Sequence, residues 1–155
     1  MAYIPENAKW YLATMVEEIS VEGDSSKVVH KNYMLIRGES PEDAYYKAQE
    51  LGKKSDVSYD NPAGRLVQIT FKGLSELNVI HDELEHGAEL LYEELIGLSE
   101  DQIEALVRPK EALGVFQPVC ARGAPDYSSK EVSAAATRLM DAEAGGTPGP
   151  TGAQR

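Results

Sequence analysis

The chain has few residues of several kinds, and each shortage argues against a class of protein. Cys120 is the single cysteine among 155 residues, so no intrachain disulfide can form. A lone thiol is typical of a reducing compartment, and we therefore expect a cytoplasmic protein. No stretch approaches the roughly 20 apolar residues of a membrane-spanning helix. The N-terminus has no basic segment followed by an apolar run, so we expect no signal peptide.

Basic residues are the second shortage. The chain has 15 Lys and Arg against 26 Asp and Glu, a formal net charge of −11. Nucleic acids and anionic membranes attract basic surfaces, so this balance disfavours both as partners. No Lys or Arg occurs from residue 73 to residue 107, and this window holds ten acids: Glu76, Asp82, Glu83, Glu85, Glu89, Glu93, Glu94, Glu100, Asp101 and Glu104. Two interpretations stay open: an interface for a basic partner, or acids on different faces that only keep the protein in solution.

Sequence patterns for catalysis and cofactor binding are absent too. Neither GxGxxG nor GxxxxGK[ST] occurs, so no phosphate-binding loop is predicted and we expect no cofactor. Cys120 has no neighbouring His or second Cys, which favours a passive thiol over a nucleophile. His30 has no Ser, Cys or Asp placed beside it by spacing, so the sequence nominates no catalytic residue.

One segment, "HDELEH", resembles the zinc-binding helix of metalloproteases. In HExxH the two His are four residues apart on one helical face, so both reach the metal. His81 and His86 are five apart, which separates them by about 140° on a helix and puts them on opposite faces of a strand. Glu83 and Glu85 could add oxygen ligands, but the DxDxDG spacing of calcium loops is missing. The weak candidates for a metal site are His81, Glu83, Glu85 and His86, and an acidic surface is the favoured interpretation.

The first half of the chain predicts two strands and a helix. Residues 9–23 and 27–38 are rich in β-branched and aromatic residues around the turn signal "GDSS", which favours an antiparallel hairpin. Ser40 and Pro41 then mark a helix start, because Ser caps the free N–H groups and Pro fits the first helical position. Ala44, Ala48 and Leu51 repeat at helical spacing and are expected to face the sheet, and Gly52 is expected to end the helix.

The second half predicts two more strands and a second helix. "RLVQITFKG" alternates strictly, with Val67, Ile69 and Phe71 on one face. Residues 88–96 fit a strand better than a helix because Gly87 and Gly97 bound them, and a further strand is possible near residues 77–81. Ser99 and Gln102 form a capping box before a helix that Pro109 ends. The order β-β-α-β-β-α predicts an α+β domain: an antiparallel sheet with two helices packed on one face.

The composition changes after Phe116, so we predict a compact domain over residues 1–116 and a flexible tail over 117–155. The last twelve residues include four Gly and two Pro, and such a segment buries too little to order itself. Apolar residues at helical spacing predict a short helix near residues 129–143, whose docking the sequence does not decide.

The stretch from Lys9 to Phe116 resembles an uncharacterised bacterial family, domain of unknown function 4288. The resemblance rests on "KWYLATMVEEI", "MLIRGESPEDAYYKAQELG", "YDNPAG" and "ITFKGLSELNVIHDELEHGAELLY". It implies a compact α+β domain. It implies no activity, substrate or catalytic residue.

Three functions are compatible with these observations. The favoured one is a non-enzymatic protein-interaction module, possibly for a basic partner, and its candidate contact residues are Asp82, Glu83, Glu85, Glu89 and Glu93. The second is a metal-dependent enzyme or metal-binding protein that uses the His81–His86 segment. The third is a structural subunit of a larger assembly, tethered by the tail.

Overall fold

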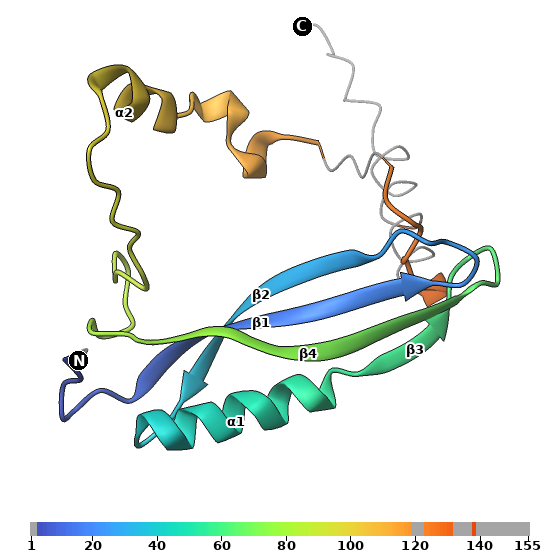
Figure 1. Ribbon diagram of the computed structural model, residues 1–155, viewed down its shortest axis with the longest axis horizontal. Helices are drawn as coiled ribbons and strands as arrows, with labels where there is room; N and C mark the ends of the chain where they lie inside the picture. The colour runs from blue at the N-terminus through green and yellow to red at the C-terminus, as the bar shows by residue number, and fades with distance from the viewer. Residues whose placement is uncertain (1–2, 119–122, 132–137, 139–155) are drawn as a thin grey trace, which may run out of the picture.

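The computed structural model describes residues 3–118, 123–131 and 138, and these residues form a curled four-stranded sheet with one packed helix (Figure 1). The strands are β1 (Trp10–Val21), β2 (Val28–Arg37), β3 (Val57–Asp60) and β4 (Leu66–Val79). Their order in the sheet is β2-β1-β4-β3, and every neighbouring pair is antiparallel. The predicted α+β class, the order β-β-α-β-β-α and the β1–β2 hairpin are therefore confirmed.

Long β4 joins two stretches that the sequence treats separately. Val67, Ile69 and Phe71 share one face as predicted, and the strand continues to Val79 through two register shifts against β1, between Thr14 and Met15 and between Val16 and Glu17. Each shift adds one residue to β4, and β-bulges of this kind increase the local bend and twist of a strand. Because β4 gains two extra residues, Leu77 and Val79 beyond the bulges lie on the same face as Phe71.

The helix α1 (Pro41–Lys54) covers half of the concave face of the sheet. It begins as predicted, because the Ser40 side chain accepts a hydrogen bond from the Asp43 N–H. Ala44 and Ala48 are buried in the cluster that Tyr11, Ala13, Met15 and Ile36 form on the sheet. Fourteen helical residues span about 21 Å, whereas the twelve residues of β1 span about 40 Å. The helix is therefore too short to cover β1 from end to end.

The C-terminal end of α1 corrects one sequence expectation. Leu51 is 41% exposed, yet it lines a cavity with Met15 and Met34 of the sheet and so lies on the predicted side. Gly52 is buried inside the helix, where an added Cβ would lie 2.5 Å from the Phe71 ring. The helix ends two residues later at Lys54, and Ser55 is its C-cap. The absence of a side chain at Gly52 is thus what allows Phe71 to pack against the helix.

Residues 88–96 do not form the predicted strand. No helix or strand is assigned to them, although Gly87 and Gly97 bound the segment at φ values of 91° and 82°. The fourth position in the sheet belongs to β3, a strand that was not predicted from the sequence. The reason is local: the Asn61–Arg65 turn brings β3 against β4 at once, and short loops cost less entropy to close than long ones.

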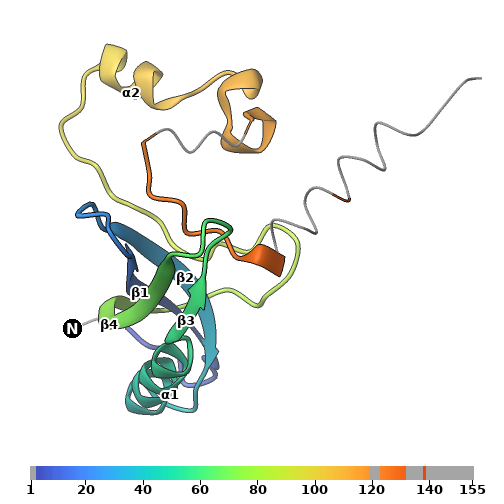
Figure 2. The same cartoon turned by 90° about the vertical axis from the view of Figure 1, so that its right-hand side faces the viewer.

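The second helix, α2 (Glu100–Leu106), forms where the capping box predicts it. The Ser99 side chain accepts from the Gln102 N–H, and the Gln102 side chain accepts from the Ser99 N–H. However, α2 has no buried residue, and both views show it standing apart from the sheet (Figures 1 and 2). The expectation that two helices pack on the sheet is therefore wrong for α2.

The predicted tail lies mostly outside the described residues, as do Cys120 and most of the predicted helix near 129–143. Residues 130, 131 and 138 are helical. Residues 124–129 return to the sheet, and Tyr127 packs against the half of the concave face that α1 leaves open. We call residues 124–129 the strap. Among the residues described, no helix has the length and apolar character needed to cross a bilayer.

Candidate protein-interaction site

Beyond β4 the chain forms a long exposed segment, residues 82–116, which we call the arm. Ile80 is the last buried residue before it, held by a hydrogen bond from its N–H to the Trp10 carbonyl at 2.9 Å. No residue of the arm itself is buried. The arm therefore begins at a fixed point on the sheet and stays in solvent along its length.

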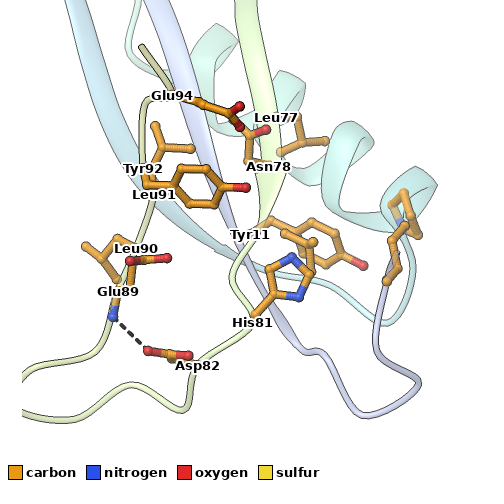
Figure 3. Close-up of a pocket in the computed structure, with 13 residues that line it drawn as sticks. Tyr11, Leu77, Asn78, His81, Asp82, Glu89, Leu90, Leu91, Tyr92 and Glu94 are labelled. Carbon is orange, nitrogen blue, oxygen red and sulfur yellow. Dashed lines mark hydrogen bonds between the residues drawn. The ribbon is translucent and has the colours of Figure 1, made fainter. Parts of the chain in front are cut away.

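The base of the arm and the end of the sheet enclose a cavity of about 500 Å³ (Figure 3). His81, Asp82 and Glu89 line it together with Tyr11, whose hydroxyl has its pKa raised chiefly by burial. The Asp82 carboxylate accepts a hydrogen bond from the Glu89 N–H at 2.9 Å, which closes the loop between them. These two acids, both predicted contact residues, are thus brought together by the backbone.

The predicted metal candidates do not gather around one point. The His81 ring stacks on Tyr3, with ring centroids 6.4 Å apart and planes 6° apart. His86, Glu83 and Glu85 are exposed and do not line the cavity. Within residues 3–118, 123–131 and 138, no three His, Cys, Asp or Glu side chains are arranged to hold a metal ion.

The acidic residues of the arm face solvent. Glu83, Glu85, Glu89 and Glu93 are exposed, as is Asp82. In the described part of the chain four ion pairs occur, and none of them includes an acid of the arm. The nine acids between residues 82 and 107 therefore form an uncompensated negative segment.

The part of the arm after residue 94, the distal arm (residues 95–116), combines this charge with apolar side chains. Ile96 is 83% exposed and Val115 is 85% exposed. All eight of its large apolar residues that are exposed come from the loop before α2, from α2 and from the turns after it: Leu95, Ile96, Ile103, Leu106, Val107, Leu113, Val115 and Phe116. Isolated exposed apolar residues are ordinary, so it is their density in one segment that makes the distal arm a candidate surface. From the sequence we expected the second helix to pack on the sheet, and so the exposure of Ile103 and Leu106 was not predicted.

The strap is the second feature that the sequence did not reveal. The Asn61 amide Nδ2 donates to the Asp126 carbonyl at 2.9 Å, and the Tyr59 hydroxyl donates to the Tyr127 carbonyl. Asn61 is only 1% exposed, and its Oδ1 accepts from the Arg65 N–H at 2.9 Å, which closes the turn between β3 and β4. One side chain thus organises the β3–β4 turn and also anchors the strap.

Around Tyr127 the strap closes a groove on the sheet. The Tyr127 ring meets His30 edge to face, with centroids 5.5 Å apart, and packs against the cluster of Ile19, Val21 and Val67. A cavity of about 750 Å³ lies between the strap and the sheet, and Ile19, His30, Tyr59 and Ile69 supply its sheet side. Because the His30 ring packs against the Tyr127 ring, a packing role fits this histidine.

Fold and site together define a small acidic α+β domain with a packed sheet and an exposed arm. The chain belongs to the DUF4288 family, a domain of unknown function, whose model matches residues 10–92. The match covers the sheet, α1 and the first part of the arm, and ends before the distal arm and the strap. No curated protein and no solved structure matches the chain significantly.

Proposed function

We propose that this protein is a non-enzymatic interaction module that binds a basic, partly apolar protein surface through its arm. The observation that carries the proposal is the exposure of the arm, in which no residue between 82 and 116 is buried. Apolar side chains supply most of the free energy of association when they leave water. A domain that displays so many of them on one segment has a surface suited to a partner.

The charge of the arm supports the proposal that the partner is basic. Nine acids without a single Lys or Arg from residue 82 to residue 107 create a directional negative field. Such a field speeds the encounter with a basic surface and makes binding sensitive to salt. We keep the cytoplasm as the proposed location, because the chain has only one cysteine.

The test is affinity capture from native extract at low and moderate salt. The wild type is compared with Glu83→Lys/Glu85→Lys/Glu89→Lys, and with a control of equal charge change outside the arm, Glu6→Lys/Asp60→Lys/Glu131→Lys. All six side chains are exposed, so both variants are expected to fold. We expect one discrete partner that the control retains and the arm variant loses. A partner held equally by both variants would show that the arm is not the binding surface.

A further inference from the structure

The face of the sheet opposite α1, which we call the open face, presents apolar side chains to solvent. Residues alternate across a strand, so Val29, Tyr33 and Leu35 on β2 point away from buried Ile36 and from α1. Val29 is 60% exposed and Tyr33 is 62% exposed. Both α1 and the strap pack on the concave face, so neither covers Val29 or Tyr33, whereas Leu35 lines a cavity with Lys47 and Glu50 of α1 at the edge of the sheet.

The open face carries basic residues, which the arm lacks from residue 82 to residue 107, beside the acids Glu18 and Glu76. By the same alternation Lys31 and Arg37 lie beside the apolar residues of β2. Lys72 of β4 follows Phe71, which faces α1, and so lies on the open side of the sheet near Glu18, whose cross-strand partner is Thr70. Lys27 is paired with Glu18, whereas none of the four ion pairs in the described residues includes Lys31, Arg37 or Lys72.

We propose that the arm binds a second copy of this chain: the distal arm of each copy packs on the open face of the other. Apolar residues of α2, Ile103 and Leu106, would cover Tyr33 and Leu35. The neighbouring acids Glu100 and Glu104 would meet Lys31 and Lys72. This inference rests on the proposed function, because it names the basic and apolar surface that the arm recognises.

The arrangement within one molecule favours a second copy as the occupant. The chain carries two exposed apolar surfaces: Lys31, Arg37 and Lys72 lie beside the one on the sheet, whereas only acids lie beside the one on α2. In both views α2 stands apart from the sheet (Figures 1 and 2). Two copies related by a two-fold axis would bring each arm to the other's open face. Such an exchange makes the same contact twice and leaves no surface free to recruit a third copy.

The first experiment measures the mass of the full chain in solution across a wide range of concentration, by analytical ultracentrifugation at low and moderate salt. We expect a reversible dimer whose dissociation constant rises with salt, because opposite charges meet at its interface. A chain that is monomeric at every concentration and salt would overturn the proposal.

Two variants test the two surfaces separately. Ile103→Asp/Leu106→Asp places charge on the apolar side of α2, and Lys31→Glu/Lys72→Glu reverses the open face. Each is expected to raise the dissociation constant at least about tenfold, as loss of central contacts does at other interfaces. The control Lys53→Glu/Lys130→Glu matches the charge change of the open-face variant at exposed positions away from both surfaces and is expected to dimerise like the wild type. A dimer unaffected by either variant would overturn the proposal.

A charge exchange identifies the contact itself. Lys31→Glu/Lys72→Glu chains mixed with Glu100→Lys/Glu104→Lys chains are expected to form a heterodimer, while each alone dimerises weakly. A monomeric wild type whose arm is protected from hydrogen exchange, with protection lost in Lys31→Glu/Lys72→Glu, would show that the arm closes on its own sheet and would overturn the inference. A monomer that still captures a foreign partner through the arm would also overturn it, but would leave the proposed function standing.

Discussion

The distal arm and the strap both follow the family-matched residues, yet the apolar side chains of the distal arm are exposed whereas that of the strap packs on the sheet. The distal arm exposes eight large apolar residues, and α2 buries none of its own. The strap has one aromatic residue, Tyr127, and that residue packs on the sheet. Apolar content alone therefore does not decide which segment joins the core.

The two segments differ because the sheet presents an apolar cluster and hydrogen-bond donors beside the strap. Because α1 is about half as long as β1, the concave face keeps an uncovered apolar cluster around Ile19 and Val67. Beside it, Tyr59 and Asn61 present two donors that satisfy consecutive carbonyls of the strap. Polar backbone atoms lose water on docking and must find partners, and the strap finds them. The distal arm meets no such pair of donors within the described chain.

Replacing Asn61 is expected to have the largest effect on this comparison. Asn61→Ala removes the bond to the strap and also the bond to the Arg65 N–H, in a site that is almost fully buried. We expect a loss of about 2–3 kcal/mol in the free energy of unfolding. Urea unfolding followed by circular dichroism measures it. Asp60→Ala, a neighbouring exposed acid, is the control and is expected to stay close to wild type; equal losses in both would assign the effect to the turn region in general.

A pair of aromatic substitutions compares the strap and the arm directly. Tyr127→Ala is expected to cost about 2 kcal/mol, less than a fully buried aromatic because the ring is half-buried. Phe116→Ala on the distal arm is expected to cost less than about 0.5 kcal/mol in the monomer. Thermal and urea unfolding at low protein concentration give both values. If Phe116 proved the costlier of the two, the packing assigned to the two segments would be wrong.

These segments also show where sequence reasoning succeeds. Ser40, Pro41, Ser99 and Gln102 act through bonds to residues only a few positions away, so both helix starts could be predicted from local pattern. The alternation of Val67, Ile69 and Phe71 identified β4 for the same reason.

Sequence reasoning fails where a distant partner decides. Residues 88–96 have a strand-like composition, but no sheet edge pairs with them in the described chain. The Asn61–Asp126 bond joins residues 65 positions apart, and a turn-forming Asn gives no sign of such a partner. In the candidate site, the sequence could predict Asp82 and Glu89 as surface acids, but it could not predict that α2 is exposed.

Alkaline pH is expected to loosen the strap and leave the arm unchanged. Burial, with smaller contributions from Tyr127 and Asp126, raises the pKa of the Tyr59 hydroxyl above its ordinary 10.0. A group with a raised folded pKa stabilises the fold fully below its unfolded value, and this stabilisation is lost as pH rises through the folded pKa. Tyr59→Phe removes the donor at all pH values, at a cost of about 1 kcal/mol. The protection of residues 124–129 from hydrogen exchange is expected to fall between pH 9 and pH 11 only in the wild type. Parallel losses in Tyr59→Phe would point to a different titrating group.

The smallest effect on stability is expected at α2, and this makes it the sharpest test of the comparison. Ile103→Ser/Leu106→Ser changes two side chains that are already exposed, so the monomer is expected to keep its free energy of unfolding to within about 0.5 kcal/mol. The same change removes apolar surface from the proposed interface and is expected to weaken self-association. A dilution series of melting temperatures separates the two: the variant is expected to match the wild type when dilute and to fall below it when concentrated, because dimerisation stabilises only the folded chain. A variant that melts lower at every dilution would mean that α2 packs on its own domain, and the arm would then resemble the strap after all.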